Sequence, residues 1–187
     1  MNEKAILLSI QPKWCDLIAS GEKTIEVRKT RPKIETPFLC YIYECGNNGR
    51  KQVVGEFVCD KITRIFECCD VHDELLNRPC EYFLDYDGDD DIPAMACLSV
   101  DEIWHYIGKE GVGYIWHISE LKIYNKPKAL SEFGTLCDED CPNCESWKCD
   151  MVNQHERDMD CTNSSYPFRP LKRPPQSWRY VEVSSNE

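Results

Sequence analysis

The sequence predicts a single α+β domain built on a small mixed β-barrel, with two or three helices between the strands. Three observations lead to this prediction. Several segments are rich in β-branched and aromatic residues and have the length of strands. Other segments carry helix start signals in front of apolar residues at helical spacing. The chain has 187 residues, 42% of them hydrophobic, which suits one ordinary domain with one core.

The first predicted elements are a strand and a helix. Residues 5–9 are mostly apolar and predict a short buried strand. Pro12 suits the first turn of a helix, where its missing N–H would have no partner in any case. Gly21 can end that helix because glycine readily adopts the left-handed conformation. The apolar residues on one face of the helix are Trp14, Leu17 and Ile18.

The hydrophobic period changes after the helix. Residues 24–28 alternate polar and apolar side chains, which predicts a strand with one face in a core. Residues 38–44 and 52–62 are rich in aromatic and β-branched residues. The sequence Gly-Asn-Asn-Gly at 46–49 favours a hairpin loop between them, so these two strands should pair antiparallel.

Two further helices are predicted in the middle of the chain. Residues 71–78 form a short one that Pro79 interrupts. Ser99 and Glu102 have the spacing of a capping box, in which each side chain accepts a hydrogen bond from the other residue's backbone N–H. Apolar side chains that share a face follow, so this helix should extend to about residue 109.

The remaining strands are predicted near the end of the chain. Residues 113–124 give the longest strand signal, which should end before Pro127 because proline cannot donate to a strand ladder. Residues 178–183 are expected to form a closing strand. Residues 134–165 have no sustained periodicity and are interpreted as a cysteine-rich insertion within the single domain of residues 1–187.

The charge pattern restricts the kind of nucleic-acid contact. A formal charge of -11 argues against a protein that coats nucleic acid nonspecifically, because phosphate attraction supplies most of that affinity. Acidic residues concentrate at 85–91 and 138–160, while basic residues gather at 23–33 and 169–179, so a local basic face is compatible with the sequence. The run 166–173 interleaves rings with positive charge, which fits either a base-stacking surface or a proline-stiffened strap over the barrel.

Membrane segments are not predicted. The longest apolar stretches, such as residues 5–10, are far shorter than the ~20 residues of a membrane span. Glu3 and Lys4 do not lead into the apolar core of a signal peptide. We therefore expect a cytoplasmic protein without membrane partners.

The thirteen cysteines fall into two groups. Eight, between positions 15 and 97, are scattered through apolar segments, where cysteine behaves as a small hydrophobic residue. The others cluster in a polar segment that offers few apolar neighbours, and their short spacings suit a structural zinc site. Free or redox-active thiols are the alternative. The expected ligands come from Cys137, Cys141, Cys144, Cys149 and Cys161.

One motif connects the chain with a known family. Residues 9–14 (Ser-Ile-Gln-Pro-Lys-Trp) are followed by Gly-Glu-Lys-Thr-Ile-Glu-Val-Arg at 21–28, which resembles the ASCH family marker, a helix followed by GxKxxExR. Residues 54–57 and 114–118 also look like the second half of ASCH proteins from bacteria and their phages. The resemblance covers roughly residues 5–133 and the last strand. It implies a PUA-like barrel with a cleft beside the marker that binds RNA or modified bases.

The marker residues form the expected ligand site. Glu26 and Arg28 are two apart on a strand, so their side chains should project from the same side, and Thr24 joins them. Arg28 offers a planar fork of donors for a phosphate or a base edge, and Glu26 can accept from an exocyclic amine or orient Arg28. The resemblance adds Lys23 as a cleft residue and Trp14 as a ligand contact. The alternative is an exposed Glu26–Arg28 ion pair that contributes about 0–1 kcal/mol.

The resemblance also leaves enzymatic functions open. Some ASCH proteins cleave RNA, which needs a general base and a cation near the scissile phosphate, and Glu26 with Lys23 or Arg28 can supply both. Others remove the acyl group from N4-acylated cytidine, with candidate catalytic residues Lys23, Thr24 and Glu26 here. Glu26 stands where their threonine nucleophile falls, and a carboxylate cannot replace a hydroxyl without a change of mechanism. We therefore expect RNA, nucleobase or nucleotide binding, with hydrolysis as the alternative.

Overall fold

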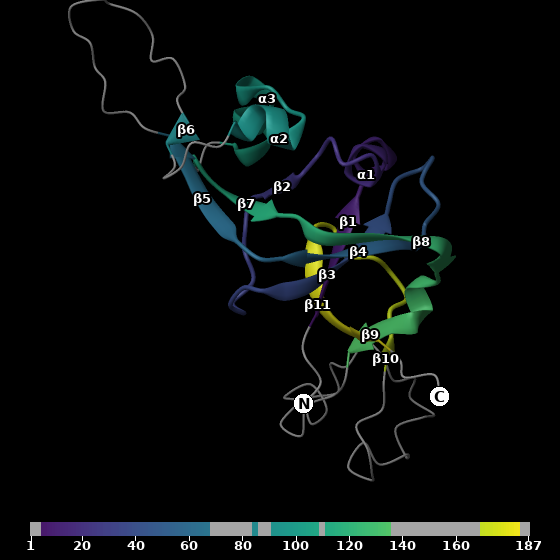
Figure 1. Cartoon of the computed structure of the whole chain (residues 1–187). Helices are drawn as coiled ribbons and strands as arrows, with labels where there is room; N and C mark the ends of the chain where they lie inside the picture. The colour runs from purple at the N-terminus through teal and green to yellow at the C-terminus, as the bar shows by residue number, and fades with distance from the viewer. Residues whose placement is uncertain (1–4, 68–83, 86–90, 109–110, 136–168, 184–187) are drawn as a thin grey trace, which may run out of the picture.

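The computed structural model describes residues 5–67, 84–85, 91–108, 111–135 and 169–183, and its strands form two sheets. One has the strand order β10-β9-β11-β1-β3-β4-β8 and the other β2-β7-β5-β6 (Figure 1). The strands of the larger sheet are β1 (Ala5–Ile10), β3 (Phe38–Glu44), β4 (Val53–Cys59), β8 (Ser119–Lys128), β9 (Phe133–Thr135), β10 (Arg169–Pro170) and β11 (Trp178–Val183). Those of the smaller sheet are β2 (Ile25–Arg28), β5 (Ile62–Glu67), β6 (Leu84–Asp85) and β7 (Val112–His117).

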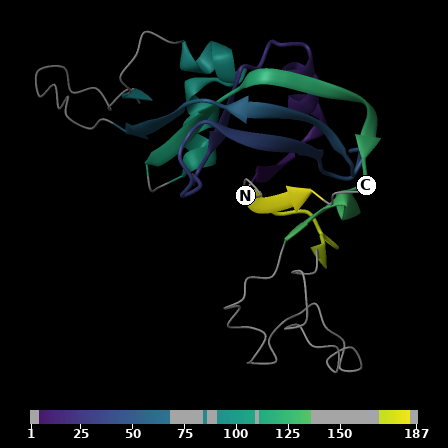
Figure 2. The ribbon, with the colours of Figure 1, turned by 60° about the horizontal axis from the view of Figure 1, so that its bottom comes forward.

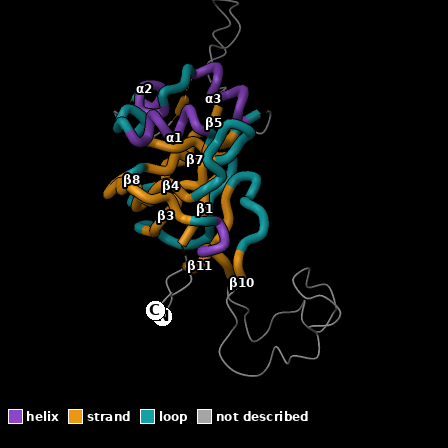
Figure 3. Tube along the Cα trace, turned by 90° about the vertical axis from the view of Figure 1, so that its right-hand side faces the viewer, coloured by secondary structure: helices purple, strands orange, loops and turns teal. Residues whose placement is uncertain are grey.

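The three α-helices of the described residues lie at one end of the molecule (Figure 3). They are α1 (Pro12–Ala19), α2 (Ile92–Ala96) and α3 (Val100–Ile107), and a 3₁₀ turn spans Leu130–Glu132. α2 and α3 cover one face of the smaller sheet, where Ile103 and Ile107 pack against Ile25, Val27 and Ile115. The mixed, curled arrangement with three helices among the described residues confirms the predicted α+β class, and the sheets form a half-barrel where the sequence predicted a small mixed β-barrel.

The larger sheet is buried on both faces in its centre, which explains why all six residues of β1 are buried. Ile6, Leu8 and Ile10 face one cluster with Phe57 and Trp116. Ala5 and Leu7 of β1 face another cluster, to which Phe133 and Leu171 also belong. β9 lies beside β10 and β11 at this side of the molecule (Figure 2). The site described below lies where the first of these clusters meets the smaller sheet.

Several predicted elements are confirmed. β3 and β4 pair antiparallel from Phe38↔Cys59 onward, as the hairpin prediction required. Ser99 and Glu102 form the predicted capping box of α3, and the hydrogen bonds from Ser99 hold the pKa of Glu102 below its ordinary value. Gly21 follows α1 with φ +80°, and β11 is the predicted closing strand. The short helix expected at 71–78 lies outside the described residues.

The long strand expected at 113–124 is two strands. β7 belongs to the smaller sheet and β8 to the larger one, and Ile118 between them donates its N–H to the carbonyl of Thr24 at 3.0 Å. β8 also continues past Pro127, which contradicts the expected end. Among the described strands it lies at the edge of its sheet and pairs with β4 alone, so a residue that cannot donate is tolerated there. The expected strand at 52–62 likewise divides, because Ile62 begins β5 in the smaller sheet.

The described cysteines mostly act as small core residues. Cys15, Cys40 and Cys59 are buried, and burial raises the pKa of Cys59 to about 12. Cys45 and Cys97 are half-buried, and all five are free thiols. None of the helices among the described residues has the length and apolar character that a membrane crossing requires.

Candidate functional site

The strand that carries the marker residues lies at the edge of the smaller sheet. β2 pairs antiparallel with β7, with Glu26 opposite Trp116 and Arg28 opposite Tyr114. Ile25 and Val27 point the other way, into the core beneath α2 and α3. Strand parity thus places Glu26 and Arg28 on one face, as predicted. All four residues of β2 are buried, however, whereas the alternating pattern predicted burial of only one face.

The turn that leads from α1 into β2 places Lys23 inside the protein. The backbone N–H of Lys23 donates to the carbonyl oxygen of Leu17 at 2.9 Å, and that of Thr24 donates to the carbonyl oxygen of Met95 at 3.0 Å. The Lys23 side chain is only 2% exposed. Its Nζ donates to the carbonyl oxygen of Ala96, the last residue of α2, at 2.8 Å. Carbonyls at the end of a helix lack intrahelical partners, so an ammonium group is a suitable donor there.

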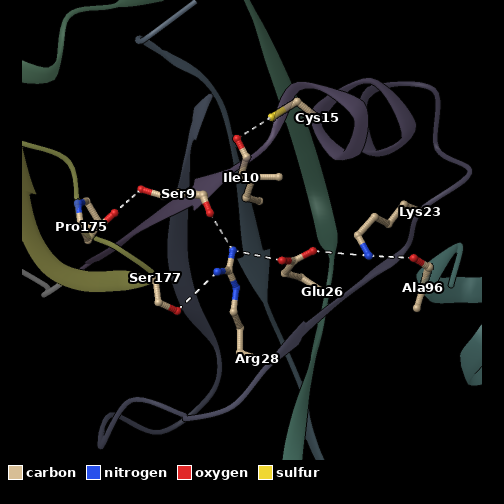
Figure 4. Close-up of polar contacts among 9 residues, drawn as sticks. All are labelled: Ser9, Ile10, Cys15, Lys23, Glu26, Arg28, Ala96, Pro175 and Ser177. Atoms are coloured by element: carbon tan, nitrogen blue, oxygen red, sulfur yellow. Dashed lines mark hydrogen bonds and ion pairs between the residues drawn. The ribbon is translucent and has the colours of Figure 1, made fainter. Parts of the chain in front are cut away.

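Glu26 lies between two cations (Figure 4). Its Oε2 is 3.4 Å from Nζ of Lys23, and its Oε1 is 3.0 Å from Nη2 of Arg28. We call Lys23, Glu26 and Arg28 the charged cluster. Their side chains are 2%, 11% and 7% exposed, so the Glu26–Arg28 ion pair of the alternative is present but is buried, whereas the alternative expected it at the surface.

Arg28 connects the charged cluster to the larger sheet. Nη2 donates to the carbonyl of Ser9 at 3.0 Å, and Nη1 donates to Oγ of Ser177 at 3.3 Å (Figure 4). Ser9 in turn donates from Oγ to the carbonyl of Pro175 at 2.6 Å and from its N–H to the carbonyl of Ser177 at 2.9 Å. The hydrogen bonds therefore join the ends of β1 and α2, the strand β2 and the segment before β11.

Two kinds of interaction are not fully satisfied in the charged cluster among the described residues: the balance of charge and one hydrogen bond. Among the described residues, it has one carboxylate for two cations, so it carries a net positive charge in a buried position. The Nε of Arg28 is also buried and has no hydrogen-bond partner among the described residues. A buried donor without an acceptor costs about 1–3 kcal/mol, so this N–H is available to an incoming acceptor.

The structure brings Trp14 to the charged cluster but not the hydroxyl of Thr24. Trp14 is half-buried on α1, and Nζ of Lys23 lies 5.3 Å from its ring centroid. Thr24 is exposed, and no described residue forms a hydrogen bond with its hydroxyl. The partners Ser9, Ala96 and Ser177 were not predicted, because two of them contribute main-chain carbonyls and Ser177 is 149 residues away from Arg28.

The expected metal site is not in the described part of the chain. Cys137, Cys141, Cys144, Cys149 and Cys161 all lie between residues 136 and 168, outside the described residues. Within the described ranges, no group of three or more His, Cys, Asp or Glu side chains is placed to hold a metal ion.

Comparisons with known proteins bear on the family and the fold. A family model described as the ASCH domain matches residues 8–104, more than half of the chain. The crystal structure of ASCH from Zymomonas mobilis is similar, with a TM-score of 0.53 and 16% identity, over 95% of this chain and 87% of that one. A tyrosine-to-phenylalanine mutant of that protein gives a TM-score of 0.53 and 16% identity over 95% and 90% of the two chains. A serine-to-alanine mutant of the same protein has a TM-score of 0.53 and 15% identity, over 96% of this chain and 89% of that one. No curated protein matches.

Proposed function

The chain belongs to the ASCH domain family, and from this premise we propose that it binds RNA by holding one nucleotide at the charged cluster beside Trp14. The observation that carries the proposal is the buried, net positive cluster, in which one N–H of Arg28 has no partner among the described residues. A phosphate oxygen or a base carbonyl can accept from this N–H. An anionic group would also balance the excess charge.

The neighbouring groups supply the other contacts that a nucleotide needs. Glu26 is the most exposed member of the charged cluster, and each of its oxygens keeps acceptor capacity for an exocyclic amine. Trp14 offers a half-exposed ring on which a base can stack. The bond from Arg28 to Ser177, at 3.3 Å, is the longest of the Arg28 bonds, so we expect a ligand to replace it.

Binding is favoured over hydrolysis by the contacts of the candidate catalytic groups. Both oxygens of Glu26 lie beside cations, and none of its contacts among the described residues is with a hydroxyl that it could deprotonate. The amidohydrolase mechanism requires a hydroxyl activated by Lys23 or Glu26, and neither side chain contacts Thr24 within the described part of the chain. Release of cytidine from N4-acetylcytidine should therefore be slow or undetectable by mass analysis.

We expect at least one of the four ribonucleoside 5′-monophosphates to bind and to change the tryptophan fluorescence on titration. Arg28→Lys keeps a cation for Glu26 but removes the planar fork, so affinity should fall by about 1–3 kcal/mol, roughly 5- to 150-fold. Arg179→Lys is the matched control. Arg179 is exposed, and because it is the next residue after Trp178 on β11, its side chain projects from the face opposite to that of Trp178. Folding of each variant is checked by circular dichroism.

Two outcomes would contradict the proposal. One is that none of the four monophosphates binds at millimolar concentration. The other is that folded Arg28→Lys protein binds as tightly as the parent protein, which would leave Arg28 with a structural role only.

We also propose that the cysteines at 137–161 hold one structural zinc, because their clustering in a polar segment has no packing reason. Protein purified under reducing conditions should contain about one zinc per chain by elemental analysis. Chelation should lower the melting temperature. A metal-free preparation whose stability does not rise on zinc addition would instead indicate free or redox-active thiols.

A further inference from the structure

The face of the smaller sheet that carries the charged cluster continues outward onto the surface. Arg28 on β2, Tyr114 on β7 and Arg64 on β5 are register partners in one row across three strands. Directly paired residues project from the same side of a sheet, so these three side chains share a face. In the neighbouring row, Trp116 is fully buried. In the opposite direction, Phe66 is 36% exposed, so the face changes from core to surface along the strands.

The outer part of this face combines exposed cations with aromatic rings. Arg31 lies 6.0 Å from the ring centroid of Tyr114, and Arg64 lies 5.7 Å from that of Phe66. Both arginines are exposed, and Tyr114 is half-buried. We call Arg31, Arg64, Tyr114 and Phe66 the aromatic-basic strip. α2 and α3 cover the opposite face of the same sheet, so the strip lies on the side of β5 and β7 that none of the described helices covers.

The charge of the strip is unusual for this protein. The chain has 33 acidic and 22 basic residues, yet neither Arg31 nor Arg64 has an ion-pair partner among the described residues. Within the part of the chain that the structure describes, these two guanidinium groups have no counter-charge, so an anionic partner can supply it. An anionic partner with flat apolar groups would satisfy both the arginines and the exposed rings.

The segment that carries Arg31 is held in place before any partner arrives. The indole N–H of Trp178 donates to Oγ1 of Thr30 at 3.0 Å, and the N–H of Lys33 donates to the hydroxyl of Tyr180 at 2.7 Å. Trp178 and Tyr180 contact each other edge-on with ring centroids 5.6 Å apart. These contacts on both sides of Arg31 reduce the entropy that binding must remove.

We propose that the aromatic-basic strip binds the single-stranded RNA next to the nucleotide at the charged cluster, a proposal that rests on the function given above. Single strands expose both phosphates and unpaired base faces, which match alternating arginines and rings. Two strand spacings, roughly 10 Å, separate the Arg28 and Arg64 backbones, which leaves room for a flanking nucleotide. A duplex keeps its bases stacked inside and cannot use Phe66 and Tyr114 in this way.

The test measures mononucleotide and oligonucleotide binding on the same variants. The probes are a fluorescein-labelled octamer of mixed sequence, the same octamer in a duplex, and the tightest-binding 5′-monophosphate. Phe66→Ala should weaken octamer binding by about 5- to 150-fold, the range for one lost base stack. Arg64→Ala should reduce the slope of log affinity against log salt by about 0.7, the value for one phosphate contact on a single strand. Monophosphate binding should not change in either variant.

Arg179→Ala is the matched control and should bind all probes like the parent protein. The strip assignment is overturned if Phe66→Ala and Arg64→Ala bind the octamer normally, or if the duplex binds as tightly as the single strand. Failure of the monophosphate to bind the parent protein would overturn the nucleotide site itself. In that case, octamer binding that depends on Phe66 and Arg64 would still support the proposal that the aromatic-basic strip binds single-stranded RNA.

Discussion

Glu26→Gln should lower the free energy of unfolding by about 3–5 kcal/mol, the usual cost of removing one partner of a buried ion pair. The substitution keeps the size of the side chain but leaves Lys23 and Arg28 as buried cations without a carboxylate. The remaining amide can accept hydrogen bonds but cannot offset two charges. Urea denaturation monitored by circular dichroism measures the loss.

A matched control distinguishes the effect of leaving buried cations unpaired from the general effect of a Glu→Gln substitution. Glu22→Gln changes the same functional group four residues earlier at an exposed position, where Glu22 accepts from Oγ of Ser20 at 3.0 Å. Its effect should stay within about 0.5 kcal/mol. The double variant Lys23→Met/Glu26→Gln should recover part of the loss because one uncompensated cation is removed. A loss below about 1 kcal/mol for Glu26→Gln would mean that the ion pairs behave as solvated surface pairs.

This structural role explains how the proposed site can tolerate an excess charge. Ser9 and Ala96 fix both cations through main-chain carbonyls, so the charged cluster keeps its geometry even though one N–H of Arg28 lacks an acceptor in the described ranges. The cost of that N–H and of the excess charge lowers stability without a ligand. A bound anion would recover it, so ligand binding and stabilisation should be linked.

The sequence predicted elements whose signals are local. The capping box of α3 needs only Ser99 and Glu102, and the β3–β4 hairpin needs two strand patterns with a turn sequence between them. The division of residues 113–124 into β7 and β8 depends instead on which strands lie beside them. One half pairs with β2 and β5, the other with β4, and no residue in the segment encodes that change of partner.

The site was predicted in its residue types but not in its environment. Because Glu26 and Arg28 are two apart on a strand, the sequence predicted that they share a face. An alternating pattern of polar residues normally indicates that this face is solvated. Here that face is covered by the end of β1 and by Ser177, which come together only through the tertiary fold. The aromatic-basic strip was not predicted, because its members come from three separate segments of the chain.

Trp116 connects the two sheets, and Trp116→Ala should lower the free energy of unfolding by about 3–5 kcal/mol. The residue belongs to β7 of the smaller sheet, but its ring is fully buried in the cluster beneath β1, β3 and β4. It contacts Phe38 edge-on at 5.7 Å and Trp178 at 5.8 Å between ring centroids. Removing the ring leaves a cavity at the point where the sheets join.

Trp116→Phe distinguishes lost packing from lost polarity. The indole N–H of Trp116 is buried without a partner in the described part of the chain, so phenylalanine removes an unsatisfied donor while keeping a ring against Phe38 and Trp178. Its cost should therefore be well below that of alanine, by about 2 kcal/mol or more in urea denaturation. Equal losses for the two variants would show that the indole N–H has an acceptor in solution and that the junction depends on that hydrogen bond.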